Sequence, residues 1–150
     1  MMDDSRFREL HGPEEIANAL HRLGGNLFDQ RVNSPEILNQ LAVKYSAKGK
    51  VITVLAGSQI VGLCAYYDND TLQKKAFLSI LVVDSKMQGN GYGKVLLQEM
   101  LKRCERNGMN CVTARVSVKN SRAICFYTEN GFSLRPESKD SLLAIKQLKA

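Results

Sequence analysis

The chain has 150 residues, of which 44% are hydrophobic and 24% charged, and its formal net charge is +6. These values are ordinary for one soluble globular domain and exclude collagen-like, low-complexity and intrinsically disordered proteins. The basic residues are scattered, without a run of five like charges, so the positive field favours a small anionic ligand over nucleic acid. We therefore expect a single domain over residues 1–150 with no nucleic-acid partner.

The cysteines at positions 64, 104, 111 and 125 form no CxxC pair, and the two histidines are distant in sequence. Because a zinc site needs such a cluster, we expect no metal. Cys64, Cys104 and Cys125 lie in apolar or helical stretches, where a reduced thiol packs as a small apolar side chain. These three are predicted to be core residues.

The first ten residues contain no apolar stretch, and no window approaches the length of a membrane span. We expect no leader peptide, no membrane partner and a cytoplasmic location.

In chain order, the first half predicts a strand over Phe7–Leu10 and then two helices. Gly12-Pro13 opens the first helix, which Gly24-Gly25 ends, and Ser34-Pro35 opens the second. Residues 51–55 and 60–67 read as a hairpin, with Val61, Leu63, Ala65 and Tyr67 on one side. Lys75–Val83 is a further strand with a very apolar end.

The second half returns to helical spacing after Gly93 and stops at Asn107-Gly108. A strand over 111–118, a short helix over 120–129 and two closing strands over 132–134 and 142–145 follow. This order predicts one mixed sheet covered by helices.

The segment 88–94 joins the buried strand to the helix and places glycines at 89, 91 and 93. Glycine permits positive φ and a close approach of backbone to a ligand. Free N–H groups at a helix start, together with the helix dipole, favour an anion. The turn is therefore predicted to bind a phosphate group.

Two familiar phosphate motifs fail on particular residues. The dinucleotide motif requires glycine at position 94, which holds Lys94, and the P-loop requires glycine at 88 and a hydroxyl at 95, which hold Gln88 and Val95. The pattern Q-x-x-G-x-G fits at Gln88, Gly91 and Gly93. It resembles the acetyl-CoA signature of the GNAT N-acetyltransferases, although Ser85 stands where that family often has proline.

A second block, N-x-x-A-x-x-F-Y-x-x-x-G-F, runs from Asn120 to Phe132 and also resembles that family. Asn120, Ala123, Ile124 and Tyr127 share one helical face by their spacing. The resemblance implies that Tyr127 protonates the leaving thiolate, a role that a hydroxyl with an ordinary pKa near ~10 can perform. It implies cofactor contacts at Leu81, Val82, Val83, Gln88, Gly89, Asn90, Gly91, Tyr92, Gly93, Lys94, Asn120, Ala123 and Phe126.

The resemblance covers residues 76–134, the acetyl-CoA half, and leaves 1–70 as the acceptor side. It implies a mixed, mostly antiparallel α/β (α+β) fold of about six to seven strands and four helices. It also implies acetyl transfer by direct attack of an amine, with the Val83 N–H polarising the thioester carbonyl. We expect the two N-terminal helices and the loop 67–71 to select the amine, with Tyr66 and Tyr67 nearby. These residues suit an amino sugar or other small amine, and equally an amino acid, a polyamine or a protein amine.

The strand Lys75–Val83 has no carboxylate, so the general base is left open among Asp29, Asp68 and Ser79 acting through water. Because a base is missing, a catalytically silent CoA-binding sensor or interaction module is the alternative. A homodimer through the C-terminal strands is a further expectation.

Overall fold

The computed structural model describes residues 6–148; residues 1–5, which belong to the segment expected to carry no leader, lie outside the described residues. Seven strands form one sheet in the order β1-β2-β3-β4-β5-β7-β6. They are β1 (Phe7–Leu10), β2 (Lys50–Ala56), β3 (Gln59–Tyr67), β4 (Lys75–Val83), β5 (Cys111–Ser117), β6 (Ser133–Pro136) and β7 (Ser141–Gln147). The described helices are α1 (Pro13–Leu23), α2 (Pro35–Lys48), α3 (Tyr92–Arg106) and α4 (Ser121–Glu129), with 3-10 turns η2 (Gly24–Asn26) and η3 (Ser85–Met87). Of the strand pairs, β4–β5 is parallel and the others are antiparallel, so the predicted fold class is confirmed.

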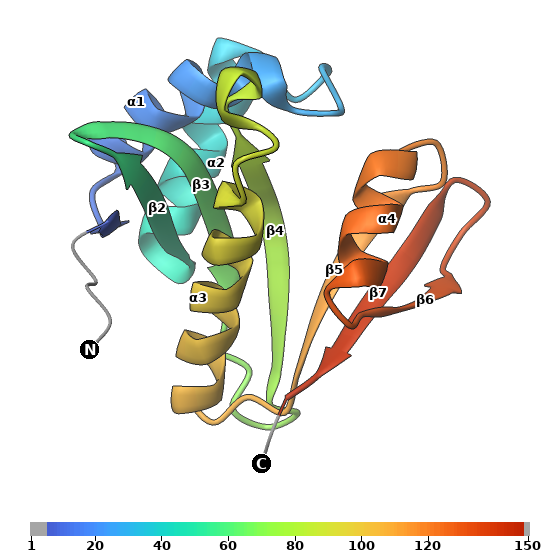
Figure 1. Cartoon of the computed structure of the whole chain (residues 1–150). Helices are drawn as coiled ribbons and strands as arrows, with labels where there is room; N and C mark the ends of the chain where they lie inside the picture. Colours follow the sequence, from blue (N-terminus) through green and yellow to red (C-terminus); the bar gives the residue numbers. More distant parts are fainter. Residues whose placement is uncertain (1–5, 149–150) are drawn as a thin grey trace.

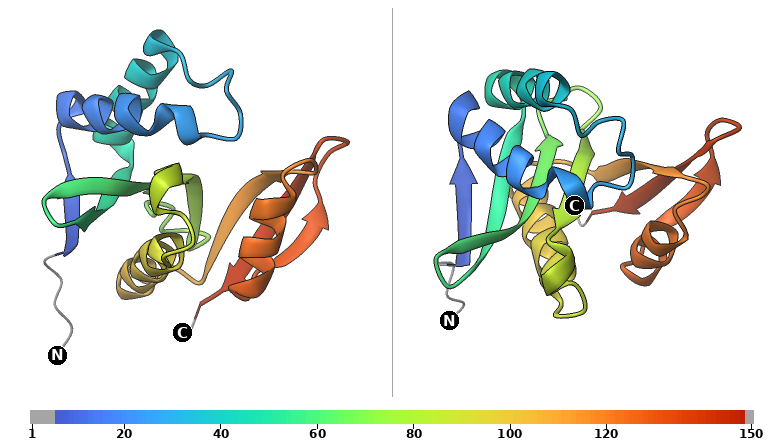
Figure 2. Two further views of the ribbon diagram at one scale, coloured as in Figure 1. Left: turned by 45° about the horizontal axis from the view of Figure 1, so that its top comes forward. Right: turned by 90° about the horizontal axis from the view of Figure 1, so that it is seen from above.

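The helices cover the two faces of the sheet in separate layers (Figures 1 and 2). Residues of α1 and α2, among them Leu20 and Leu38, form one apolar cluster with the sheet. Residues of α3 and α4, among them Leu97 and Tyr127, form a second cluster on the opposite face. The central strand β3 therefore lies between two cores, which is why its sequence reads as nearly continuous apolar residues.

One prediction for β3 is wrong. Val61 packs in the α3 layer, whereas Leu63 and Ala65 pack in the α1–α2 layer. The register explains the difference, since Val54 pairs with Gly62 and Leu55 pairs with Ile60. Val61 is the extra residue of a β-bulge, which reverses the alternation of side chains before it.

The strands β4 and β5 pair for only part of their length. Residues 75–78 of β4 pair with residues 111–114 of β5, whereas the pairing of β4 with β3 continues to Val83. Beyond that point β5, β7 and β6 diverge from β4, and a wedge-shaped gap opens in the sheet (Figure 1). Among residues 6–148, this divergence leaves one edge of β4 without a partner strand, and it positions the site described below.

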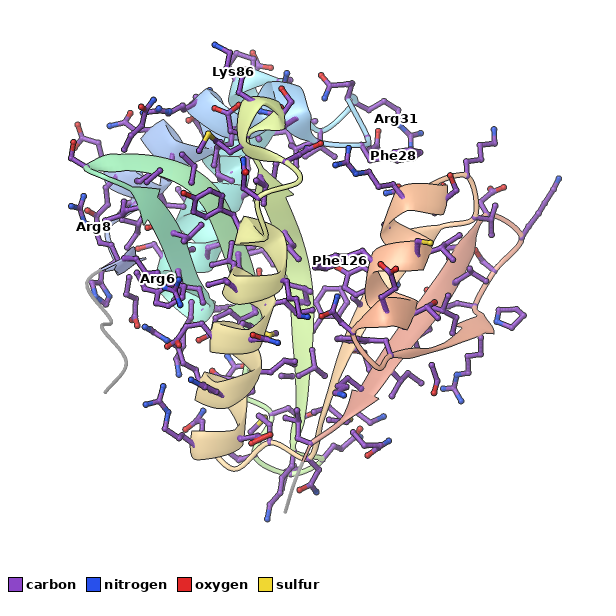
Figure 3. The ribbon with its side chains drawn as sticks, in the orientation of Figure 1. Arg6, Arg8, Phe28, Arg31, Lys86 and Phe126 are labelled. Atoms are coloured by element: carbon purple, nitrogen blue, oxygen red, sulfur yellow. The ribbon has the colours of Figure 1, made fainter. Side chains whose placement is uncertain are left out.

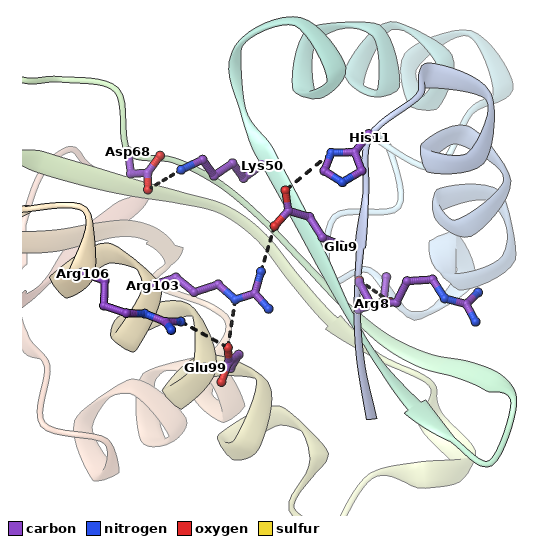
Figure 4. Close-up of polar contacts among 9 residues, drawn as sticks. Arg8, Glu9, His11, Lys50, Asp68, Glu99, Arg103 and Arg106 are labelled. Atoms are coloured by element: carbon purple, nitrogen blue, oxygen red, sulfur yellow. Dashed lines mark hydrogen bonds and ion pairs between the residues drawn. The ribbon is translucent and has the colours of Figure 1, made fainter. Parts of the chain in front are cut away.

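A polar network fixes the C-terminal half of α3 (Figure 4). Arg103 donates to Glu99 on its own helix at 2.9 Å and to Glu9 on β1 at 2.8 Å. Nearby, Lys50 pairs with the buried Asp68 at 3.0 Å, and Asn107 at the end of α3 donates to the Asp68 carbonyl. The loop 67–71 therefore lies at the C-terminal end of α3, far along the helix from the glycine-rich turn. It does not line the cleft described below, and its predicted role in selecting the acceptor stays a prediction.

Cys64, Cys104 and Cys111 are buried, but Cys125 is exposed, so its predicted core position is wrong. Helix α4 lies at the surface and buries the face that carries Tyr127, and Cys125, two residues earlier, points away from that face. Residues 6–148 contain no group of three or more metal-ligating side chains. No helix in that range is long and apolar enough to cross a membrane.

Candidate active site

The glycine-rich turn has the backbone shape that its sequence predicts. Gly89 and Gly91 have φ values of 88° and 82°, a region that side-chain-bearing residues rarely adopt. Gly91 is also the N-cap of α3, so no side chain there can accept from the first N–H groups of the helix. By contrast, Ser34 caps α2 and Asn120 caps α4. The start of α3 thus presents backbone donors that suit an anion.

Side chains of the turn hold its shape from within. The Gln88 amide donates to the Val83 carbonyl at 3.2 Å, and the Asn90 amide donates to the Met87 carbonyl at the same distance. Both predicted cofactor residues therefore also have a structural task. Asn90 does not line the cleft described below.

The free edge of β4 carries the next set of backbone groups. The Asp84 N–H donates to the Val61 carbonyl on β3 at 2.8 Å. Because N–H groups alternate along a strand, those of Leu81 and Val83 point away from β3 and into the gap. The geometry matches what a ligand needs to pair with the strand.

Helix α4 forms the opposite wall. The Asn120 Oδ1 accepts from the Ala123 N–H at 3.1 Å, which fixes the start of the helix and leaves the amide NH₂ of Asn120 for other partners. A Cβ built on Gly93 would lie 3.6 Å from the Phe126 ring. This is an ordinary van der Waals distance, so the start of α3 lies close to the Phe126 ring of α4.

Tyr127 sits at the inner end of this wall and is 8% exposed. Its ring packs edge-on against Phe126 and Phe132, with centroids 5.4 and 5.1 Å apart. Burial raises the pKa of the Tyr127 hydroxyl above its ordinary value, and the buried thiol of Cys64 adds to the effect. The hydroxyl therefore stays protonated at neutral pH and remains able to donate a proton.

These walls enclose a cleft of about 860 Å³. Of the predicted site residues it is lined by Leu81, Val82, Val83, Gln88, Gly89, Gly91, Tyr92, Gly93, Lys94, Asn120, Ala123, Phe126 and Tyr127. A cleft of this size accommodates a large ligand in an extended pose. The fold thus brings together two segments that are distant in sequence.

The cleft also has lining residues that the sequence analysis missed, namely Asn26, Leu27, Phe28, Met87, Lys119, Ser121, Arg122, Glu129 and Asn130. Arg122 and Glu129 share a helical face with Phe126 at spacings of four and three, a signal that could have found them. The segment 26–28 has no such signal because only the fold brings it near the turn. Figure 3 shows Phe28 above the gap and Phe126 between α4 and β4.

Basic side chains outnumber acidic ones among the residues that line the cleft. Lys94, Lys119 and Arg122 line it, and Glu129 is its single carboxylate among the described residues. This balance favours an anionic ligand.

None of the three predicted base candidates lines the cleft. Asp68 is paired with Lys50 at the far end of α3. Asp29 is paired with Arg31 at 2.9 Å, and the Ser79 hydroxyl is bonded to the Tyr45 hydroxyl at 2.7 Å on the α2 side of the sheet. None of these three candidates therefore lies beside Tyr127 to act as the general base.

Comparisons with known proteins agree with this arrangement. Residues 14–132 match the model of the acetyltransferase (GNAT) family. The fold is similar to an acetyltransferase from Thermus thermophilus, with a TM-score of 0.77 at 18% identity over 98% of this chain and 100% of the other. It is also similar to the PaiA N-acetyltransferase of Thermoplasma acidophilum solved with coenzyme A (TM-score 0.74, 19% identity, 94% and 98% covered). A third similar structure is the ribosomal-protein-alanine N-acetyltransferase of Brucella melitensis (0.73, 18%, 94% and 99%). A search of curated proteins found no match.

Proposed function

Because this chain belongs to the GNAT acetyltransferase family and is thus an acetyl-CoA-dependent acyltransferase, we propose that it acetylates a primary amine by direct attack on the thioester. One observation carries the proposal. The unpaired edge of β4 ends in a left-handed glycine turn, and a buried, protonated Tyr127 lies on the facing wall of the same cleft.

The residues present fit acetyl-CoA. The turn offers backbone donors at the start of α3 for a diphosphate, and Lys94 and Arg122 add positive charge. The outward N–H and C=O groups of Leu81 and Val83 suit the amides of a pantetheine arm. The bound cofactor supplies an activated acetyl thioester, and the chain supplies its position.

Four residues of this chain act on the reaction. The Val83 N–H points into the gap and is positioned to stabilise negative charge on the thioester oxygen. The Tyr127 hydroxyl is positioned to protonate the leaving thiolate. Asn120 and Ala123 hold the cofactor arm in register with Tyr127.

The acceptor enters beside the connection between α1 and α2, since Asn26, Leu27 and Phe28 border the cleft there. The loop 67–71 does not line the cleft and is held at the C-terminal end of α3, and Tyr66 is fully buried. We propose a small amine, such as an amino sugar, as the acceptor. The Brucella protein, whose acceptor is a ribosomal protein by its name, makes a peptide amine the alternative to test.

The test is release of free thiol from acetyl-CoA against a panel of amino sugars, amino acids, polyamines and peptides with a free N-terminus. Selective release with one class identifies the acceptor. If coenzyme A binds but no amine gives release above hydrolysis, the acetyltransferase proposal is refuted and a silent CoA-binding module is favoured. If coenzyme A does not bind, both readings are refuted.

The role of Tyr127 is tested by Tyr127→Phe. We expect turnover to fall by about 10²–10⁴-fold, the usual contribution of a general acid, with little change in the affinity for acetyl-CoA. Tyr66→Phe is the matched control, because the Tyr66 hydroxyl is buried outside the cleft and has no partner among the described residues. Equal turnover in both variants would exclude Tyr127 as the acid.

A further inference from the structure

We infer that Asn26 is a positioning residue that fastens the acceptor side of the cleft to the turn that holds the cofactor. The Asn26 Oδ1 accepts a hydrogen bond from the Ser85 backbone N–H at 2.9 Å, across 59 positions of sequence. Ser85 begins η3, which leads directly into the glycine-rich turn. The inference rests on the proposed function, which identifies one side of the cleft as the acceptor side and the other as the cofactor side.

The connection from Gly24 to Ser34 is otherwise tied mainly to itself. The Gln30 amide donates to the carbonyls of Gly24 and Leu27 at 3.2 and 2.6 Å. The N–H groups of Leu27, Val32 and Asn33 bond to carbonyls within the same segment. Over residues 6–148, Asn26–Ser85 is the only hydrogen bond that joins residues 24–34 to residues 84–94.

The residue type at position 85 matters for this bond. The donor is a backbone N–H, which proline lacks. The serine hydroxyl has no hydrogen-bond partner in the part of the chain that the structure describes. Serine at 85 therefore allows a link to the connection that proline would exclude.

The consequence is coupling between the two halves of the cleft. Asn26 lines the cleft together with Leu27 and Phe28, so the bond holds the acceptor border at a fixed distance from the turn. When a ligand orders the turn, the Ser85 N–H is ordered with it, and the connection is held more firmly. We expect cofactor binding to prepare the acceptor border, and loss of the bond to weaken binding of the acceptor alone.

The test is hydrogen exchange of the full chain with and without coenzyme A. In the wild type, we expect saturating coenzyme A to slow exchange both in the turn and at the amides of Leu27, Val32 and Asn33. Removal of one neutral hydrogen bond shifts a local equilibrium by roughly 2- to 10-fold, which sets the expected size. In Asn26→Ala and Ser85→Pro, slowing should persist in the turn and be lost in the connection.

Two variants are matched controls. Asn26→Asp keeps an acceptor oxygen, and Ser85→Ala keeps the backbone donor, so both should retain the slowing in the connection. Ser85→Pro fits the backbone, because Asp84 has φ −52° and ψ 129°, values that a residue before proline accepts. Asn26→Ala removes the acceptor of the bond and Ser85→Pro removes its donor. If one of these two variants fails to fold, the other still tests the coupling.

With an amine that supports turnover, Asn26→Ala should raise the KM for that amine by roughly 2- to 10-fold and leave the KM for acetyl-CoA unchanged. If coenzyme A binds and slows exchange in the connection equally in the wild type and the four variants, the coupling is refuted and the proposed function stands. If coenzyme A does not bind the wild type, the proposed function fails and the inference fails with it.

Discussion

Replacement of Gly91 by valine separates backbone strain from ligand binding at the proposed cofactor turn. Gly91 has φ 82°, and a Cβ built there meets no atom within 4 Å, so the substitution causes no clash in the structure. The cost is conformational. A left-handed residue with a side chain costs about 1–2 kcal/mol, and a β-branched one costs more.

The turn has two ways to respond. If it keeps its shape, the protein loses about 1–2 kcal/mol of stability, or roughly 2–4 °C in Tm for each kcal/mol. If it relaxes, the N–H groups at the start of α3 turn away from the diphosphate. Hydrogen bonds to charged groups contribute about 1.5–3 kcal/mol each, so the loss of two weakens coenzyme A binding by at least ~100-fold. We expect the second response, because nothing packs against position 91.

Isothermal calorimetry with coenzyme A and thermal unfolding measure the two effects. Gly57→Val is the matched control: Gly57 also has positive φ (63°) and empty surroundings, but it lies in the β2–β3 hairpin outside the cleft. It should lose stability and keep its affinity. Gly91→Asn should be intermediate, since asparagine tolerates left-handed geometry. Wild-type affinity for coenzyme A in Gly91→Val would refute the proposal that the backbone N–H groups of this turn bind the diphosphate.

Two further predictions concern the buried Tyr45. Tyr45→Phe should lower the free energy of unfolding by about 1 kcal/mol in urea titrations. The reason is that Ser79, the extra residue of a bulge in β4, loses its only side-chain hydrogen bond among the described residues. An unchanged urea midpoint would contradict this. Burial raises the pKa of Tyr45 to about 12, whereas a tyrosine in the unfolded chain ionises near ~10. The folded state then holds a proton that the unfolded state releases, so stability should fall as pH rises from about 10 to about 12, and more shallowly in Tyr45→Phe. Urea midpoints against pH check the slope. Tyrosinate absorbance that appears before unfolding in the wild type and is missing in Tyr45→Phe would disprove it.

Much of the fold follows from local sequence. Strand and helix limits are set by signals such as Gly12-Pro13, Ser34-Pro35 and Asn107-Gly108, and the structure places elements at nearly the same residues. The fold class and the family are likewise confirmed. The individual residue roles, Tyr127 included, remain predictions until they are measured.

The errors share one cause, which is that they concern positions decided by packing. A bulge at Val61 reverses the side-chain alternation, and no local pattern marks where a strand gains an extra residue. Cys125 is exposed because helix α4 buries only one face. The loop 67–71, which was expected to help select the acceptor, is held by a bond from Asn107 at the other end of α3 from the glycine-rich turn.

The conformation of the turn and the chemistry it can offer follow from local sequence, because glycine spacing, helix starts and apolar periodicity act over a few residues. Which residues face that turn across the cleft depends instead on the tertiary structure. The divergence of β5 from β4 after residue 78 opens the gap, and the fold carries Asn26 to Ser85. Such contacts depend on how whole strands and helices pack, and a local pattern does not record them.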